Sequence, residues 1–450
     1  MPQSFARPGV SRIAVIGAGI AGLTAAIRLS AEHDVVVFER ETSAGGKIRS
    51  QKLDGYLFEW GPAGILSSDE ELAELVAELG LSDALAPAES AAKNRFIYWA
   101  GALHRLPASP REALTLSLLT PLGRLRALGE MLVPKGSKGR DESVFAFMQR
   151  RFGRQVAERI VAPALLGVSG GDAATTSLDA IFPRLRAMEC EHGSILRGMM
   201  KGARKPATTC TFTDGGMQTL TDRLAERLGE RVRLGVTVER VEPAEAGWRV
   251  THSAGETSAD AVIVATPAAA AARLVEGFDA ELAARLREIP YAPMRVVGLA
   301  FRAEDVPVSL DGFGFLAARR QQVRILGALY TSSIVPGHAP AGTAYLRVFL
   351  GGSTDPEIAT LDAAAVRSIV LTDVKSALGI SAAPLAYHEV TWPEAIPQYK
   401  LGHRVLVASI EKLESAHARF ALTGNSYRGL SVGDTVRDAR AAAARISEAL

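Results

Sequence analysis

Short runs of hydrophobic residues near the start of the chain predict a strand, a helix and a second strand in close succession. Residues 13–16 are apolar and rich in β-branched side chains, which is typical of a buried parallel strand. A helix is predicted over residues 21–31, and a second buried strand follows at 34–38. This order predicts a βαβ unit at the start of the fold.

Hydrophobic runs later in the chain predict further elements of the same kind. An amphipathic helix is expected at 219–229, followed by strands at 232–241, 247–252 and 261–265. Close to the end, two short apolar runs precede a glycine-containing turn and a final helix. These last segments are residues 404–408, 420–425 and 435–450.

Glycines in the turn between the first strand and the helix predict a dinucleotide site. The first glycine permits a tight turn, the second lets the backbone approach a pyrophosphate, and the third lets the helix pack on the strand. The N–H groups at the start of the helix then face the phosphates. The contact residues predicted at this turn are Gly17, Ala18, Gly19, Ile20, Ala21 and Gly22.

A carboxylate and a second pair of glycines indicate which dinucleotide is bound. Glu39 ends the second strand, where it can accept hydrogen bonds from ribose hydroxyls and disfavours the 2′-phosphate of NADP. The glycine pair that follows, with basic residues beside it, suits a long ligand and resembles the glycine-doublet motif of flavoproteins. We therefore predict non-covalent FAD. The predicted contacts here are Glu39, Arg40, Gly45, Gly46, Lys47 and Arg49.

Two insertions separate the segments of the cofactor half. Residues 96–204 look mainly helical, whereas 271–389 mixes strands at 294–301, 325–331 and 344–350 with a helix at 362–378. We predict an α/β fold in which a discontinuous Rossmann-type FAD domain carries a helical domain and an α+β substrate domain. The three segments of the FAD domain are 10–95, 205–270 and 390–450.

Composition and charge narrow the possible functions. The chain has 450 residues, enough for two or three domains, and its net charge of +2 gives no overall electrostatic case for binding nucleic acid. Cys190 and Cys210 show no metal or redox spacing, so no metal is predicted. The scattered histidines form no convincing catalytic pair. They include His104, His192, His338, His388 and His403.

No segment predicts a secretory signal or a membrane-spanning helix. Residues 1–12 lack an apolar core, and glycines and prolines break the uncharged stretch 325–346. Leucines between residues 114 and 132 alternate with arginines, which fits either a membrane-surface helix or an ordinary amphipathic helix pair. We therefore expect a cytoplasmic protein whose membrane contact is at most peripheral, and a homodimer is left open.

As a whole, the chain resembles the protoporphyrinogen oxidases, flavoenzymes of late haem synthesis. The blocks that carry this resemblance follow the order of that family from the opening glycines to the final helix. A single block would be weak evidence, whereas the ordered set is strong. The blocks are 61–64 (GPAG), 93–98 (KNRFIY), 167–172 (GVSGGD), 311–316 (DGFGFL), 396–399 (IPQY) and 424–429 (GNSYRG).

The resemblance implies a porphyrinogen substrate and residues that bind it. Arg95 matches the family position that pairs with a propionate, a role that suits the guanidinium fork. Gly167 matches a glycine whose carbonyl faces the macrocycle, although a plain helix C-cap is an alternative. One of Phe313 and Phe315 is expected to stack on a pyrrole ring, and at least one of them to lie in the domain core.

The resemblance also adds residues on the cofactor side. These are the turn Gly61, Pro62, Ala63 and Gly64, together with Val238 and Trp392. The start of the final helix can point its N–H groups at the flavin ring. The residues expected to lie closest to the ring there are Val432, Gly433 and Asp434.

The implied reaction is the oxidation of protoporphyrinogen IX to protoporphyrin IX. Successive hydride transfers to flavin N5 would use dioxygen as the electron acceptor and give hydrogen peroxide. Because the flavin carries the chemistry, no catalytic side chain is predicted.

Three alternatives stay open at this point. Coproporphyrinogen III carries more propionates and needs more basic groups; Arg95 alone stands out by motif, although Lys47, Arg184, Arg186 or Arg197 could also converge on the cleft. An amine oxidase or a carotenoid desaturase would share the fold, but no aromatic cage or lysine-held water can be placed. A flavin-binding protein without catalysis is disfavoured by the intact substrate-side blocks.

Overall fold

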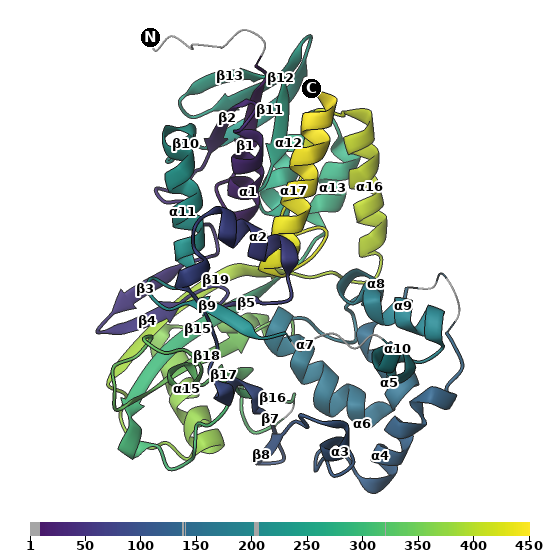
Figure 1. Cartoon of the computed structure of the whole chain (residues 1–450), viewed down its shortest axis with the longest axis vertical. Coiled ribbons are helices and arrows are strands. Elements are labelled where there is room, and N and C mark those ends of the chain that lie inside the picture. The colour runs from purple at the N-terminus through teal and green to yellow at the C-terminus, as the bar shows by residue number, and fades with distance from the viewer. Residues whose placement is uncertain (1–9, 137–138, 140, 202–206, 320) are drawn as a thin grey trace.

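The computed structural model describes residues 10–136, 139, 141–201, 207–319 and 321–450. Figure 1 shows a sheet with helices on both faces at the top, a larger sheet at lower left and a group of helices at lower right. Both sheets are built from segments that are far apart in the sequence. The predicted α/β fold with a discontinuous Rossmann-type domain is confirmed.

The upper sheet has five parallel strands in the order β10-β2-β1-β14-β20. Alternate residues along each strand face opposite layers. On β1, Ile13 and Val15 pack with helices α1, α2, α11 and α17, whereas Ala14 and Ile16 pack with α12, α13 and α16. Cover on both faces explains why these strands are continuous apolar runs. The strands are β1 (Arg12–Ile16), β2 (Asp34–Phe38), β10 (Val232–Arg233), β14 (Ala261–Val264) and β20 (Phe420–Leu422).

The helices of this domain lie close to their predicted positions. Helix α1 spans Ile20–Leu29 and α11 spans Gln218–Leu228. The apolar run at 404–408 lies inside helix α16 (His403–Ala416), because Leu406, Ile410 and Leu413 repeat at helical spacing and bury one face. The remaining helices are α2 (Glu70–Glu78), α12 (Ala268–Val275), α13 (Ala280–Arg287) and α17 (Val432–Ala449). A meander of β11 (Val238–Ala244), β12 (Gly247–His252) and β13 (Gly255–Ala259) packs beside them.

The lower sheet has seven strands in the order β19-β15-β18-β17-β16-β7-β8. One face of its central strands packs on helix α15 (Ala363–Leu378), and the other meets the hairpin of β3 (Ser50–Leu53) and β4 (Tyr56–Glu59). Most of β7 and all of β8 lie within residues 96–204, where mainly helix was expected, yet they join this sheet because β7 pairs in parallel with β16. The strands are β7 (Arg95–Trp99), β8 (Ala102–Arg105), β15 (Tyr291–Arg302), β16 (Gly314–Ala317), β17 (Gly327–Leu329), β18 (Thr343–Gly351) and β19 (Ala386–Pro397).

The helical region surrounds a small apolar core and a buried ion network. Phe147 and Leu178 lie in the core, while Arg151 and Glu130 form a fully buried ion pair that also reaches Glu189. Among the described residues, no helix is both long and apolar enough to span a bilayer. The predicted boundary at 204–205 falls outside the described residues. The helices of this region include α4 (Pro121–Leu128), α7 (Ala162–Ser169) and α9 (Pro183–His192).

Candidate active site

The first glycine turn has the geometry that the sequence predicts. Gly17 has φ +103°, in the region that favours glycine, and its N–H donates to the Phe38 carbonyl over 2.8 Å. A Cβ on Gly22 would lie 1.9 Å from the Gly17 carbonyl oxygen, so only glycine lets α1 pack this closely. Gly19 is the N-cap of α1 and has no side-chain cap, and a Cβ on it would meet no atom within 4 Å. Open space therefore lies in front of the helix start at Ala18–Ala21.

Glu39, which directly follows β2, stabilises this turn by hydrogen bonds. Its buried carboxylate accepts the N–H of Ala18 over 2.7 Å and that of Glu41 over 3.0 Å. The N–H groups of residues 235 and 236 donate to the carbonyls of Glu41 and Glu39, which brings Val238 to the same edge. Arg40 is exposed and pairs with its neighbour Glu41.

The glycine doublet lies directly against the first glycine turn. Gly45 and Gly46 both have positive φ, +112° and +60°, and the Gly45 N–H donates to the Ala18 carbonyl over 2.8 Å. A Cβ on Gly46 would lie 3.3 Å from the Gly19 Cα. The two loops therefore form one cradle of backbone, next to a hollow of about 340 Å³ that reaches Arg49 and Gln218. An uncapped helix start, open space at Gly19 and a carboxylate at the strand end fit the phosphates and ribose of FAD.

The predicted basic residues turn from this cradle toward the lower sheet. Lys47 Nζ donates to the Ala395 carbonyl over 2.7 Å and lies 5.0 Å from the centre of the Tyr291 ring. Burial lowers the pKa of Lys47 to about 8, although the Glu394 carboxylate opposes the shift. The Arg49 guanidinium lies 5.5 Å from the Trp392 ring. Lys47, Arg49 and Trp392 thus meet where β19 passes the glycine loops.

The turn at residues 61–64 joins the cradle to the lower sheet. A Cβ on Gly61 would lie 1.8 Å from the Lys47 carbonyl oxygen, and one on Gly64 would lie 2.8 Å from the Cys210 carbonyl oxygen. Pro62 and Ala63 are half-buried between these two close approaches. The Trp392 indole N–H donates to the Trp60 carbonyl over 2.8 Å. The turn is therefore fixed by contacts on both sides.

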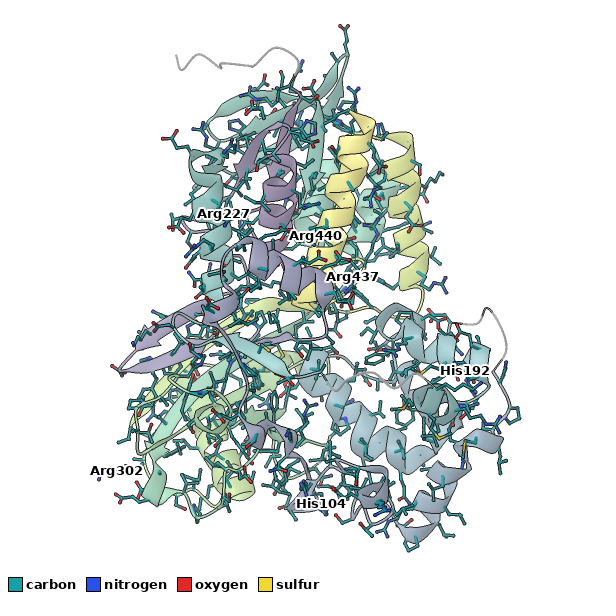
Figure 2. The ribbon with its side chains drawn as sticks, viewed as in Figure 1. His104, His192, Arg227, Arg302, Arg437 and Arg440 are labelled. Atoms are coloured by element: carbon teal, nitrogen blue, oxygen red, sulfur yellow. The ribbon has the colours of Figure 1, made fainter. Side chains whose placement is uncertain are left out.

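The start of the final helix is engaged by carboxylates of the chain itself. Ser431 caps α17, and its hydroxyl accepts the Asp434 N–H over 3.0 Å, while the Asp434 carboxylate accepts the Ser431 N–H. The Asp69 carboxylate lies against Gly433, where a Cβ would be 1.6 Å from Oδ2. Arg437 and Arg440 extend from α17 toward α2 and pair with Asp69 and with Glu74 and Glu78 (Figure 2). A flavin contact at Val432–Asp434 stays a prediction.

The substrate-side residues meet at the pairing of β7 with β16. The exposed Arg95 guanidinium lies 5.1 Å from the centre of the half-buried Phe313 ring. Phe315 is only 2% exposed and packs in the core with Tyr98 and Tyr330. Of the two phenylalanines, Phe313 is therefore the accessible one, and the expectation that at least one lies in the core is confirmed.

Gly167 lies within helix α7 and not at its end. The C-cap is Gly170, with φ +63°, so the alternative of a C-cap role for Gly167 is wrong. A Cβ on Gly167 would lie 2.2 Å from the Leu316 side chain, so glycine lets α7 approach β16. Leu316 was not singled out in the sequence, although strand alternation places it on the face opposite Phe315.

An apolar cluster that the sequence did not reveal links α7 to the cofactor side. Leu326 and Met294 are buried in it with Leu166, and Phe349 and Trp392 pack against them. Since Trp392 also contacts Arg49, this cluster continues to the flavin cradle. We call Leu166, Met294, Leu326 and Phe349 the apolar wall. Two of the histidines lie in the lower part of the molecule, His104 on β8 and His192 at the end of α9 (Figure 2).

Comparison with known proteins tests these expectations. The family model described as flavin containing amine oxidoreductase matches residues 20–447, nearly the whole chain. The chain belongs to this family. The family consists of flavin-containing oxidoreductases, so the predicted FAD cofactor and FAD-dependent oxidoreductase are confirmed.

Relatives that match over nearly their full length act on porphyrinogens by name. The mitochondrial protoporphyrinogen oxidase of Nicotiana tabacum is 30% identical over 94% of this chain and 92% of its own. The coproporphyrinogen III oxidase of Bacillus subtilis is 29% identical over 98% of both chains. A provisionally assigned protoporphyrinogen oxidase structure from Exiguobacterium sp. 255-15 has the same fold, with a TM-score of 0.86 at 23% identity, covering 98% of this chain and 99% of that one. The predicted resemblance to the protoporphyrinogen oxidases is confirmed.

Proposed function

We propose that this protein oxidises protoporphyrinogen IX to protoporphyrin IX in haem synthesis, with dioxygen as the electron acceptor and hydrogen peroxide as the by-product. One observation carries the proposal. The exposed guanidinium of Arg95 stands beside the accessible Phe313 ring, on the same sheet that carries the apolar cluster reaching Trp392 and Arg49. That arrangement suits a large apolar ring that bears carboxylates at its rim.

The residues of this chain bind and orient the substrate. In the described part of the chain Arg95 has no ion-pair partner, so its N–H groups are free to hold a propionate in a bidentate pair. Phe313 offers a flat face beside it, and the apolar wall excludes water from the reacting carbon. FAD, when bound, supplies the hydride acceptor. Glu39 and the glycine loops hold the ribose and phosphates of the cofactor.

The basic groups of the region favour a substrate with few carboxylates. Arg186 is already paired with Asp179, Glu142 and Glu189, and these partners raise its pKa despite burial. Lys47 is held by the Ala395 carbonyl. Arg184 and Arg197 are exposed on helices of the helical region, whereas Arg95 lies on the lower sheet beside Phe313. With Lys47 and Arg186 engaged, Arg95 is the clearest cation for a propionate, which supports protoporphyrinogen over coproporphyrinogen.

The test measures both substrates on one enzyme preparation. Anaerobic FAD-loaded protein receives protoporphyrinogen IX or coproporphyrinogen III, air is admitted, and porphyrin fluorescence and hydrogen peroxide are followed. We expect the larger kcat/KM with protoporphyrinogen and peroxide in proportion to the electron pairs removed. A larger kcat/KM with coproporphyrinogen III would show that this substrate is preferred, as the name of the Bacillus subtilis relative suggests. No activity with either substrate would refute porphyrinogen oxidation.

We further propose that the leucine-rich segment around α4 makes a peripheral contact with the cytoplasmic face of a membrane. Leu118 and Leu119 of this segment are buried, whereas Leu122, Leu125 and Leu132 are 78%, 67% and 85% exposed. Clustered exposed leucines favour an apolar interface over an ordinary surface. Leu125→Ser with Leu132→Ser should reduce co-sedimentation with anionic lipid vesicles, whereas Leu385→Ser, an exposed leucine elsewhere, should not. A loss of homodimer in sizing experiments, with vesicle binding unchanged, would assign the segment to a second copy instead.

A further inference from the structure

Arg347 is a buried arginine on the face of β18 that is directed toward the turn at residues 61–64, which we call the flavin turn. Alternation along the strand puts Tyr345, Arg347 and Phe349 on this face, while Leu346 and Val348 enter the core under α15 on the other. The side chain of Arg347 is only 3% exposed. Nothing in the sequence marks this residue, because a single arginine in an apolar strand has no motif around it.

The guanidinium of Arg347 holds the first residue of the flavin turn. Its Nη2 donates a hydrogen bond to the Gly61 carbonyl, and its carbon lies 4.9 Å from the centre of the Phe349 ring. Its Nε has no hydrogen-bond partner, and no carboxylate forms an ion pair with it in the described part of the chain. A buried donor without an acceptor costs free energy, so this guanidinium is not fully satisfied by the protein alone.

A buried carboxylate fixes the strand that leads into the same turn. Glu59, two residues before Gly61, accepts the Ser50 hydroxyl and the Met217 N–H, each over 2.7 Å. Burial raises the pKa of Glu59 to about 7, and burial also lowers the pKa of Arg347 to about 10. The positive field of Arg347 opposes the shift at Glu59, so the two charges act on each other across the turn.

We propose that Arg347 is a positioning residue for the bound flavin. From β18 of the lower sheet it holds the Gly61 carbonyl, and it thereby sets the position of the flavin turn relative to the apolar wall. The proposal rests on FAD binding alone and not on the identity of the substrate. Every measurement below therefore uses the flavin without a porphyrinogen.

The test compares variants of Arg347 with a matched buried arginine on the neighbouring strand. Arg295 of β15 is 6% exposed and fully engaged with Glu389 and with the carbonyls of Ile358 and Leu361, away from the turn. Arg347→Gln should raise the Kd of the apoprotein for FAD by about tenfold or more. It should also change the visible circular dichroism of the flavin and lower its midpoint potential, because a nearby cation favours the electron-rich reduced form. Arg295→Gln should leave all three flavin signals unchanged.

Two further variants separate charge from geometry and keep the test valid if Arg347→Gln does not fold. Arg347→Lys keeps the charge, so we expect the wild-type potential with altered dichroism. Glu59→Gln removes a negative charge while keeping the size of the side chain, so the potential at pH 8 should rise. It should also abolish a pH-dependent step of the flavin dichroism near pH 7.

Other groups around Glu59 do not explain such a step. Its neighbours are Ser50, the Met217 N–H, Tyr345 and Arg347; burial keeps the pKa of Tyr345 far above this range. His338, which faces Arg347, has its pKa lowered by burial. Wild-type FAD affinity, dichroism and potential in folded Arg347→Gln would overturn the proposal. Wild-type FAD affinity, dichroism and potential in both Arg347→Lys and Glu59→Gln would also overturn the proposal.

Discussion

Substitution at Gly19 separates cofactor binding from folding more cleanly than any other change in the glycine loops. Gly19 has φ −75° and ψ 177°, a conformation open to any L-residue, and a Cβ there would touch nothing within 4 Å. Gly22, three residues later, differs sharply, since its Cβ would lie 1.9 Å from a carbonyl oxygen. Gly19→Ala therefore probes the space kept for the ligand, whereas Gly22→Ala probes the packing of α1.

The expected magnitudes differ for the two variants. In the apoprotein, Gly19→Ala loses about 1 kcal/mol of N-cap preference and regains about 0.4–1 kcal/mol from a less flexible unfolded chain, so its Tm should barely change. In the holoprotein the methyl group stands between the backbone N–H groups and the pyrophosphate. Losing one charge-assisted hydrogen bond of about 1.5–3 kcal/mol raises the Kd for FAD by about 10- to 150-fold. Gly22→Ala should cost about 1–3 kcal/mol of folding stability through overpacking.

Titration of each apoprotein with FAD, followed by flavin fluorescence, measures the Kd, and thermal melts without FAD measure the folding cost. Gly19→Ala should lose affinity with an unchanged apoprotein Tm, and Gly22→Ala should lose Tm first. If Gly19→Ala binds FAD as tightly as the wild type, the pyrophosphate does not pass Gly19, and the cradle is misassigned.

Four further substitutions test the site. Arg95→Ala should raise the KM for the porphyrinogen about tenfold or more, with FAD content unchanged, because a charge-assisted pair with a propionate is lost; unaltered kinetics would remove Arg95 from the site. Phe313→Leu should raise KM with little change in Tm, whereas Phe315→Leu should lower Tm, since Phe315 lies in the core; the opposite pattern would exchange their roles. Lys47→Met should stabilise the apoprotein below pH 8, because both folded and unfolded chains are then protonated and the buried charge disfavours the folded one. This gain in stability should decrease as the pH rises from about 8, the pKa of Lys47 in the folded protein, through 10.5, its unshifted pKa. Denaturant melts at pH 7 and pH 10.5 measure the gain, and an equal gain at both pH values would show that the pKa of Lys47 is not shifted.

Local features of the sequence predicted the cofactor half well. The strand at 34–38, the tight turn at Gly17 and the close packing at Gly22 all depend on residues within one βαβ unit. Helix α16 shows the limit of local patterns, because the apolar run at 404–408 is part of a longer helical face that reaches Leu413. Short apolar runs fit either a strand or a buried helix segment, and only the longer period separates them.

The substrate side could be predicted only in part, because its geometry depends on pairing between distant strands. The choice between Phe313 and Phe315 follows from where β16 begins: Phe315 lies inside the strand and packs in the core, whereas Phe313 precedes Gly314, whose φ is +137°. Leu316 contacts α7 at Gly167, and this contact between distant segments has no local sequence signal. The contact of Asp69, which precedes α2, with the start of α17 likewise joins segments far apart in the chain and has no local sequence signal.

The cofactor loops and the substrate sheet are joined by specific polar contacts, and this bears on how the two halves work together. Lys47 bonds the Ala395 carbonyl, Trp392 bonds the Trp60 carbonyl, and Arg347 bonds the Gly61 carbonyl. Each contact ties a residue of the flavin cradle or its turn to β18 or β19. A shift of the lower sheet would therefore also move the flavin cradle and the turn at residues 61–64, because a bonded backbone carbonyl can follow its donor only if its own loop moves. With a porphyrinogen bound as proposed, substrate position and flavin position would be set by the same strands, which is what a reaction between two bound rings requires.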